Sequence, residues 1–358
     1  MRPALSRATG VGTYLLNLVS ALSILDQENA YHLFSSSWKE RLPLLTYGSN
    51  FTLHDKRWPV RILNPLWNYF AMPGLDTMLG ITLQITHSPT PIVLPSEKAR
   101  SITMVHDLFF YQHPRQVVRE MRSYCRLVKA NCARSDAIIA VSEYTKSRIL
   151  ELLDVPASKI HVIRHGADPF FEQRASENEI KLLRTEYRIE KPYLLFAGTR
   201  EPRKNLERLL TAFHNFSHDV QLVLAGPEGW GPDRWKSLVT NRVVLTGYLT
   251  REALRALYQG ALAFVFPSLE EGFGLPMLEA MASGTPVAAS RIPVFQEIGG
   301  DAFLSFDPAD IEEIRSALDS IVADAALRTT LIEKGAIRAK AFSWKEAARQ
   351  TLELYRML

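Results

Sequence analysis

The chain has 358 residues, of which 47% are hydrophobic and 22% are charged, an ordinary composition for a globular protein. This length allows two domains, each with its own hydrophobic core. The formal net charge of +4, from 42 Lys and Arg against 38 Asp and Glu, is too small an excess to indicate nucleic-acid binding.

No apolar run approaches the roughly 18 to 20 residues of a membrane-spanning helix, and the N-terminus lacks the residue order of a signal peptide. These features predict a cytoplasmic protein. Cys125 and Cys132 fall in one helical pattern, which places them about 10.5 Å apart along the axis, too far for a disulfide. We expect both to be buried thiols in a reducing compartment.

The N-terminal segment reads Thr-Gly-Val-Gly-Thr-Tyr at residues 9–14 and looks like a glycine loop that opens a helix over residues 14–22. A glycine loop of this kind normally follows a strand, but no strand pattern precedes it. Residues 1–8 read as the end of a loop whose strand is missing. Either the first strand is absent or the assigned start is late, and the intact mass of the native protein separates these alternatives.

Short apolar runs alternate with amphipathic stretches along the chain, which is typical of βαβ units and predicts parallel sheets. The strands predicted in the first half are residues 84–87, 101–105, 137–141 and 161–163, and those in the second half are residues 193–197, 220–225, 243–246, 263–267 and 286–289. A polar stretch from residue 166 to about 190 suits a linker. We therefore predict an α/β protein of two doubly wound domains, with the boundary near Asp168.

A basic loop follows the predicted strand at residues 193–197. Arg203 and Lys204 lie there, just before a helix for which Asn205 is the predicted N-cap. Because α/β sheets bind ligands at the carboxyl ends of their strands, two cations beside a helix N-terminus would suit a diphosphate. The alternative is a solvated pair of charges, which position alone leaves equally open.

A second strand, glycine loop and helix occupy residues 263–283. We expect the helix to span residues 276–283, with Pro276 at its first position and Gly284 after its end. The backbone amides of Gly274 and Leu275 would then point at an anion.

Two glutamates accompany this loop. Glu279, in the predicted first helical turn, is better placed to accept hydrogen bonds from ribose hydroxyls than to lie beside a phosphate. Glu271, in the loop, would face whatever lies beyond the phosphates.

The spacing of Glu271 and Glu279 resembles the motif of the large group 1 (family 4) class of retaining glycosyltransferases with the GT-B architecture, in which two Rossmann-like domains face each other across a cleft. The resemblance covers nearly the whole chain, and the order of its motifs is specific. They are Thr9-Gly-Val-Gly12, Val105-His-Asp-Leu108, Val141-Ser-Glu-Tyr144, residues 163–168, Glu201-Pro-Arg-Lys-Asn205, Leu245-Thr-Gly-Tyr248, residues 271–279 and Phe342-Ser-Trp344.

This resemblance implies an N-terminal acceptor-side domain of residues 1–168, completed by a C-terminal helix at residues 343–358, and a donor domain of residues 169–342. It implies that Arg203 and Lys204 bind the donor diphosphate, that Glu279 holds the ribose and that Glu271 contacts the transferred sugar. The other implied donor contacts are Gly12 from the N-terminal domain, Tyr248 and Leu249 around the base, and Gly272, Phe273, Gly274 and Leu275 in the glycine loop.

A histidine, His106, follows the predicted strand at residues 101–105. A single histidine is more often structural than catalytic. The resemblance reverses that preference, because the matching histidine borders the donor sugar and the acceptor. The catalytic residues implied are therefore His106, Glu271, Arg203 and Lys204.

The chemistry of transfer builds negative charge on the departing diphosphate, so positive charge fixed beside it would assist most. The chain has no Asp-x-Asp motif and no cluster with metal-ligand spacing, so we expect neither a metal nor another cofactor. Retention would then follow from attack by the acceptor on the same face, as is generally proposed for the family.

The partners implied are a nucleotide sugar, with GDP-mannose as the first expectation and a UDP-sugar as the second, and a glycan or polyprenyl-linked acceptor of surface polysaccharide synthesis. A basic helical face at residues 115–134 and the cationic, aromatic stretch at residues 56–70 would suit contact with the anionic inner face of the cell membrane. The alternative for both is an ordinary solvated helix and a packing loop.

Other functions share part of this pattern. A glycoside hydrolase needs two carboxylates but no cationic loop, and a dinucleotide oxidoreductase needs a third glycine after Gly12, which is absent. A GT-B-like epimerase or phosphorylase and a catalytically silent nucleotide-sugar-binding subunit remain open alternatives.

Overall fold

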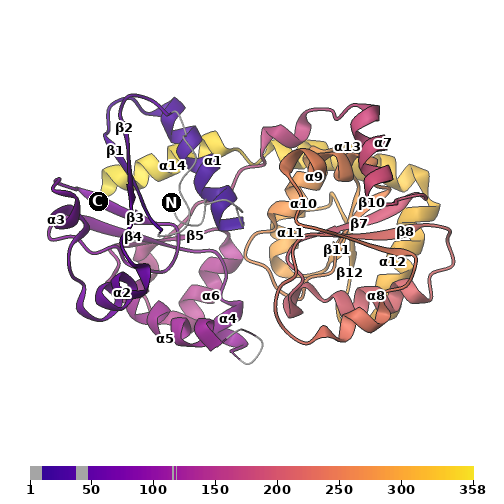
Figure 1. Ribbon diagram of the computed structural model, residues 1–358, viewed down its shortest axis with the longest axis horizontal. Helices are drawn as coiled ribbons and strands as arrows, with labels where there is room; N and C mark the ends of the chain where they lie inside the picture. The colour runs from indigo at the N-terminus through magenta and orange to yellow at the C-terminus, as the bar shows by residue number, and fades with distance from the viewer. Residues whose placement is uncertain (1–9, 38–46, 115–116, 118) are drawn as a thin grey trace. The chain divides into compact units, whose positions relative to one another are not determined.

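The structure is a computed structural model that describes residues 10–37, 47–114, 117 and 119–358, with only the backbone described at Val60 and residues 119–126. The chain divides into two compact units (Figure 1). Unit 1 comprises Met1–Tyr111, Arg119–Gly166 and Ser343–Leu358, and unit 2 comprises Gln112–Val118 and Ala167–Phe342. Each unit is described by itself.

Unit 2 is built on a six-stranded parallel sheet in the order β12-β11-β10-β7-β8-β9. Its strands are β7 (Tyr193–Ala197), β8 (Gln221–Ala225), β9 (Val243–Gly247), β10 (Ala263–Phe266), β11 (Val287–Ser290) and β12 (Leu304–Phe306). The five strands predicted in this half are confirmed. They read as continuous apolar runs because both faces of a parallel sheet are covered by helices. β12 was missed, since three residues are too short to show a pattern.

The helices of unit 2 cover both faces of this sheet, as in a doubly wound fold (Figure 1). They are α7 (Glu177–Glu186), α8 (Leu206–His214), α9 (Arg251–Gly260), α10 (Leu275–Ala282), α11 (Pro293–Gly299), α12 (Ile311–Ala323) and α13 (Ala325–Lys340), with the short helices η4 (Pro169–Glu172), η5 (Pro202–Lys204) and η6 (Asp233–Leu238). Large side chains such as Phe196, Phe213 and Phe264 are fully buried between the layers.

The strand order reverses at the centre of this sheet. From β7 the chain moves outward through β8 to β9, then returns to place β10 on the other side of β7. The loops that follow β7 and β10 therefore lie at the carboxyl edge beside this switch point, which is where open α/β sheets bind ligands.

Unit 1 contains two parallel sheets, β1-β2 and β3-β4-β5-β6. The strands are β1 (Tyr31–Ser36), β2 (Phe51–Lys56), β3 (Ile85–Ser88), β4 (Arg100–Val105), β5 (Ala137–Ala140) and β6 (Ile160–Val162). The four predicted strands are confirmed as β3 to β6. β1 and β2 were not predicted, because most of their side chains are half-buried or exposed and include His, Ser, Asp and Lys.

The helices of unit 1 are α1 (Gly10–Leu25), α2 (Val60–Pro65), the π-helix η2 (Leu66–Phe70), α3 (Leu75–Leu79), α4 (Phe109–Gln112, reaching into unit 2), α5 (Arg119–Arg134), α6 (Glu143–Leu153), the short η3 (Ala157–Lys159) and α14 (Trp344–Met357). The prediction of a glycine loop before the first helix is wrong, because Gly10 and Gly12 already lie in the first turn of α1. The expectation that no strand precedes the helix concerns residues 1–8, which lie outside the described residues. Cys132 is a buried free thiol, whereas the side chain of Cys125 is not described.

The return of the chain into unit 1 depends on Gly166. A Cβ atom at Gly166 would lie 2.1 Å from the backbone nitrogen of Trp344 and 2.6 Å from the carbonyl carbon of Ser343. Next to it, the rings of His165 and Trp344 stack with centroids 5.5 Å apart. The start of α14 therefore packs directly on the backbone of residue 166, with no room for a side chain.

We expect Gly166→Ala to lower the melting temperature of unit 1 by several degrees, since overpacking of this kind costs about 1 to 3 kcal/mol. Differential scanning calorimetry would measure it. Gly10→Ala is the matched control, because a Cβ there meets no atom within 4 Å. Equal melting temperatures for Gly166→Ala and the control would contradict this account of the packing.

Candidate active site

The loops after β7 and β10 contact each other at the carboxyl edge of the unit 2 sheet. The backbone amide of Leu269 donates to the carbonyl oxygen of Arg203 at 2.8 Å, which ties the second loop to the first. The side-chain amide of Asn205 donates to the carbonyl oxygens of Pro267 at 3.1 Å and Pro308 at 2.8 Å. Asn205 occupies the N-cap position of α8, as predicted, but its backbone is left-handed, at φ 58°, and its side chain makes no cap hydrogen bond.

Arg203 and Lys204 both bind Glu271 across these loops. The Arg203 guanidinium contacts one Glu271 carboxylate oxygen at 2.5 Å and a carboxylate oxygen of Glu201 at 2.5 Å. The Lys204 ammonium contacts the other Glu271 oxygen at 2.5 Å, and the Ser268 hydroxyl donates to that oxygen at 2.8 Å. The structure thus brings together Arg203, Lys204 and Glu271, which the sequence analysis assigned to the site. With Glu201 and Ser268 they form a group of five residues that we call the Glu271 cluster.

The charges of the cluster fix its protonation. Burial alone would raise the pKa of the Glu271 carboxyl, but Arg203, Lys204 and the hydrogen bonds from Lys204 and Ser268 lower it to about 2. Burial lowers the pKa of Lys204 and Arg203 lowers it further, while Glu271 and Glu201 oppose this. The ordinary pKa of lysine is far above neutrality and a carboxylate lies against it, so we take the pair as charged.

The cluster as a whole carries two cations and two carboxylates, so the positive charge expected from the sequence is largely balanced. All four side chains are at most 17% exposed. An anion arriving beside Arg203 or Lys204 would therefore compete with Glu271 for their N–H groups. Within the cluster the two cations are therefore neutralised by the two carboxylates.

The glycine loop after β10 leads into α10 through Gly274. Its backbone is left-handed, at φ +101°, and a Cβ there would lie 3.0 Å from the ring of Phe295, so only glycine fits without strain. α10 begins at Leu275, so Pro276 occupies the second position rather than the predicted first. The amide of Leu275 is at the helix start, where N–H groups have no intrahelical partner and can bind an anion.

Glu279 has a different environment from that of Glu271. It lies in the second turn of α10, not the first as predicted, and the Tyr258 hydroxyl donates to it at 3.2 Å. Burial raises the pKa of this half-buried glutamate to about 7. The Tyr258 hydrogen bond and the charge of Arg251 lower this pKa, whereas the charge of Asp168 raises it further. Near neutral pH Glu279 therefore exchanges readily between its protonated and ionised forms.

The remaining predicted donor contacts lie on the carboxyl edge of the same sheet. Tyr248, 45% exposed, and Leu249, half-buried, directly follow β9. Gly272 is buried, and the buried Phe273 ring packs edge-on against Phe342 with centroids 5.8 Å apart. The Phe273 side chain is part of the packing of unit 2, so a ligand would meet the backbone of this loop.

His106 and Gly12 belong to unit 1. His106 follows β4, and its Nε2 atom donates to the carbonyl oxygen of Pro89 at 3.0 Å. Burial lowers the pKa of His106 while Pro89 and Asp107 oppose the shift, so the ring is neutral at pH 7. Tyr14, two residues after the buried Gly12, packs edge-on against the His106 ring with centroids 5.4 Å apart. The start of α1 and His106 thus lie together within unit 1.

Sequence reasoning missed three residues of the site. Glu201 stands inside the quoted motif Glu-Pro-Arg-Lys-Asn, which offered a signal for its pairing with Arg203. Ser268 directly follows the predicted strand at residues 263–267, a weaker signal. Tyr258 gave no signal in the sequence, because a tyrosine within an amphipathic helix usually belongs to the core.

Two further properties of the described residues bear on function. Within residues 10–37, 47–114, 117 and 119–358, no group of three or more His, Cys, Asp or Glu side chains is placed to hold a metal ion. In the same part of the chain, no helix is long and apolar enough to cross a membrane.

Comparison with known families gives two matches that together span most of the chain. Residues 8–170 match the model described as glycosyltransferase family 4, and residues 180–338 match the model described as glycosyl transferases group 1. The gap between the two matches, residues 171–179, lies in unit 2 shortly after the boundary between the units at residues 166 and 167.

Among characterised relatives, O-antigen chain mannosyltransferase B of Escherichia coli is 29% identical, with 98% of this chain and 96% of that protein aligned. The serotype-specific mannosyltransferase WbdA of the same species is also 29% identical, over 71% of this chain but only 33% of that protein. The hydrolase and oxidoreductase alternatives find no counterpart in these relatives, and the epimerase and silent-subunit alternatives are not favoured.

Solved structures share the fold. Sucrose-phosphate synthase from Thermosynechococcus elongatus has a TM-score of 0.77 at 23% identity, covering 98% of this chain and 94% of that one. HepE of Anabaena in complex with UDP-glucose has a TM-score of 0.73 at 17% identity, covering 98% and 96%. The fold is that of the GT-B glycosyltransferases, and the chain belongs to the group 1, family 4 glycosyltransferases.

Proposed function

We propose that the chain is a retaining glycosyltransferase that takes a hexose, mannose first, from a nucleotide diphosphate sugar held in unit 2 and transfers it to a glycan in surface polysaccharide synthesis. The observation that carries this is the Glu271 cluster at the point where the strand order of unit 2 reverses. Arg203 and Lys204 lie there at the carboxyl edge of the sheet, the same edge at which the start of α10 stands.

The bond that breaks joins the sugar carbon to the diphosphate oxygen, so negative charge grows on the leaving group. Arg203, Lys204 and the amide of Leu275 would stabilise this charge. When the diphosphate binds the cations, Glu271 becomes free to accept hydrogen bonds from sugar hydroxyls. Its lowered pKa keeps it ionised, which suits an acceptor and not the acid of a hydrolase.

The other roles follow the same reasoning. Glu279 would accept hydrogen bonds from the ribose, and Tyr248 and Leu249 would frame the base with their backbone. His106 and Gly12 of unit 1 would serve the sugar and the phosphates. We infer same-face attack by the acceptor hydroxyl, without a metal or other cofactor; activity that persists in a chelator would support this.

GDP-mannose is the proposed donor because the relative aligned over nearly its full length is an O-antigen mannosyltransferase. A UDP-sugar is the second candidate, since HepE was solved with UDP-glucose. The acceptor proposed is a glycan or polyprenyl-linked glycan, and the site proposed for the enzyme is the cytoplasm or the inner face of the cell membrane.

Contact with an anionic membrane has support at residues 56–72 of unit 1. Ile62, Tyr69, Phe70 and Met72 are each 59% to 70% exposed, and Arg61 is exposed beside them. Exposed aromatic and aliphatic side chains next to cations are suited to a headgroup layer. Of the basic face expected at residues 115–134, Lys129 is exposed and lies 3.7 Å from the Asp154 carboxylate, whereas the side chains of Arg119, Arg122 and Arg126 are outside the described ones.

We expect Lys204→Ala to lower turnover about 100-fold or more, because it removes one of the charges that stabilise the leaving diphosphate. GDP release from GDP-mannose with a polyprenyl-linked glycan would measure it. The variant should also bind GDP less tightly while its affinity for guanosine is unchanged. Lys236→Ala is the control, since Lys236 is an exposed lysine of unit 2 paired with Glu228 and Asp233. Wild-type turnover in Lys204→Ala would overturn the diphosphate role.

Glu279 predicts opposite pH effects on binding and on stability. Ribose hydroxyls need the ionised carboxylate, so donor affinity should rise as pH increases through about 7. In the free protein the pKa of Glu279 is higher in the folded state than in the unfolded state, so the folded state holds the carboxyl proton to higher pH. The free energy of unfolding should therefore decrease as pH rises from about 4.5 to about 7. Glu279→Gln should remove both dependences, as measured by calorimetric titration and thermal melts.

Tyr258→Phe is the matched test of this assignment. It deletes the hydroxyl that donates to Glu279, so the pKa of Glu279 should rise and the pH at half-maximal donor affinity should move upward. Donor affinity that stays flat with pH in the wild-type protein would exclude Glu279 from the ribose site.

The membrane proposal predicts that vesicles containing phosphatidylglycerol bind the protein at low salt and release it as salt increases. Tyr69→Ser combined with Phe70→Ser should weaken flotation with these vesicles several-fold. Ile337→Ser is the control, since Ile337 is 74% exposed on α13 in unit 2. Failure of the wild-type protein to float would refute membrane contact.

A further inference from the structure

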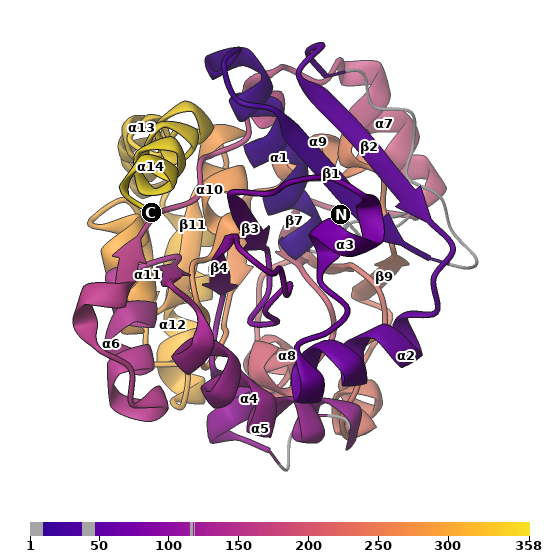
Figure 2. The same cartoon turned by 90° about the vertical axis from the view of Figure 1, so that its left-hand side faces the viewer.

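Unit 1 has a sheet that is interrupted between two parallel strands. β1 pairs with β2 alone, and β3 pairs with β4 alone, so each has one edge without a strand partner in the described chain. Figure 2 shows β1 and β2 beside α1 and apart from β3 and β4. Unpaired edges of this kind are a ready template for another strand.

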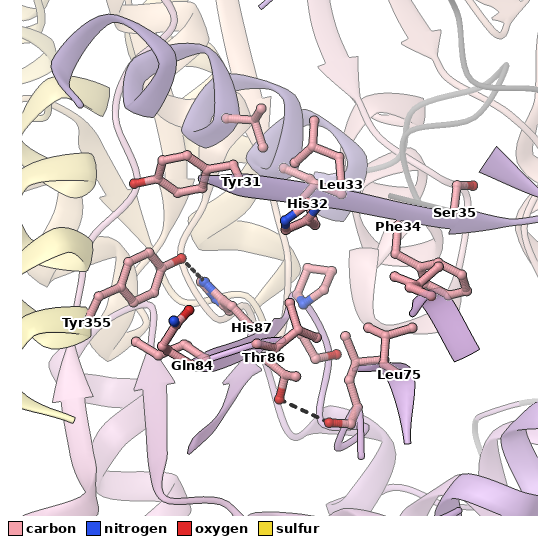
Figure 3. A pocket seen from close by; sticks show the side chains of 18 of the residues that line it. Tyr31, His32, Leu33, Phe34, Ser35, Leu75, Gln84, Thr86, His87 and Tyr355 are labelled. Carbon is pink, nitrogen blue, oxygen red and sulfur yellow. Dashed lines mark hydrogen bonds between the residues drawn. The ribbon is translucent and has the colours of Figure 1, made fainter. Parts of the chain in front are cut away.

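A cavity of about 1100 Å³ lies between these two edges. Every residue of β1 and β3 lines it. β1 lies on one side and Thr86 and His87 on the other, and Tyr355 and Leu75 lie at its ends (Figure 3). Protein interiors rarely leave voids larger than a water molecule. Volume alone would also fit a small ligand, but a ligand pocket does not require two strand edges as its walls.

The connection from α1 to β1 indicates what belongs in the cavity. α1 covers it with Leu15, Leu18, Val19 and Leu22, then leads into β1 after the connection of residues 26–30. A helix that packs on a parallel sheet and leads into one of its strands is normally the crossover of a βαβ unit. The first strand of that unit would lie beside β1, on the side away from β2.

The chemistry of the walls agrees with a polypeptide occupant. Most of the lining is aliphatic or aromatic, yet the Ser35 Oγ and His87 Nε2 atoms are buried there without a hydrogen-bond partner in the described chain. A strand would bring backbone N–H and C=O groups to both edges along about 20 Å, the length of six residues. An aliphatic ligand would leave these polar groups unpaired.

Residues 1–8 do not have the composition of this strand. They read Met-Arg-Pro-Ala-Leu-Ser-Arg-Ala, with a proline and two arginines in eight positions. A strand between two others must donate from its backbone on both sides, which excludes proline from its interior, and arginine is rarely buried unpaired. An apolar, β-branched segment is required instead.

We propose that the cavity is the place of a parallel strand of the same chain, supplied by residues that precede residue 1, which joins β1 to β3 and makes one seven-stranded sheet in unit 1. The proposal is independent of the donor chemistry.

The experiment begins with the intact mass of the protein purified from its native source. We expect a mass above the 40.5 kDa of residues 1–358. Hydrogen exchange then compares the native chain with the 358-residue chain. Amides of β1 and β3 should exchange about 100-fold or more slowly in the native chain, while β10 of unit 2 is an unchanged internal control.

A proline placed at the centre of the added strand is the matched variant, and it should return β1 and β3 to the exchange rates of the 358-residue chain. A native mass of 40.5 kDa would overturn the proposal. So would a longer native chain whose added residues leave the exchange of β1 and β3 unchanged. A hydrophobic molecule that copurifies with the native chain and protects the same amides would show a ligand pocket instead.

Discussion

The contact on which the candidate site depends is the Glu271 carboxylate held between Arg203 and Lys204. It links the loop after β7 to the loop after β10 at the point where the sheet of unit 2 reverses its strand order. Glu271 is 68 residues from Arg203 and 67 residues from Lys204 in the chain. A buried ion pair contributes little net stability once desolvation is counted. Its value here lies in geometry, because it fixes two cations at the carboxyl edge of the sheet and keeps their charge compensated.

Two glutamates eight positions apart differ in protonation because their surroundings differ. Glu271 contacts two cations and has a pKa of about 2, whereas Glu279 is half-buried beside a tyrosine and has a pKa of about 7. One carboxylate is therefore permanently charged and the other responds to pH near neutrality. Under the proposed function, this division would let one loop and one helix bind two different parts of a nucleotide sugar.

The sequence predicted most of the fold where strands are covered on both faces. β7, β8, β10 and β11 are continuous apolar runs, so composition alone located them. β1 and β2 have partly exposed faces with His, Asp and Lys, and no periodicity separated them from loops. Gly10 and Gly12 were misread as a loop because glycine favours turns, although packing of α1 against α14 supports a helix there.

Within the site, the chain order of motifs located Arg203, Lys204, Glu271 and Glu279, but not their partners. The pairing of Arg203 with Glu201 and Glu271, and of Glu279 with Tyr258, is tertiary and has no periodic signature. The side-chain hydrogen bonds of Asn205 were missed for the same reason, since its carbonyl partners at Pro267 and Pro308 are remote in sequence.

The central claim is that unit 2 holds a nucleotide diphosphate sugar. The most direct test is a calorimetric titration of the native protein with GDP-mannose, UDP-glucose, UDP-GlcNAc and NAD. The account predicts that one sugar nucleotide binds and raises the melting temperature, because a ligand that binds only the folded state stabilises it, and that NAD does not bind. Binding of NAD alone, or of none of the four to the native chain, would contradict it.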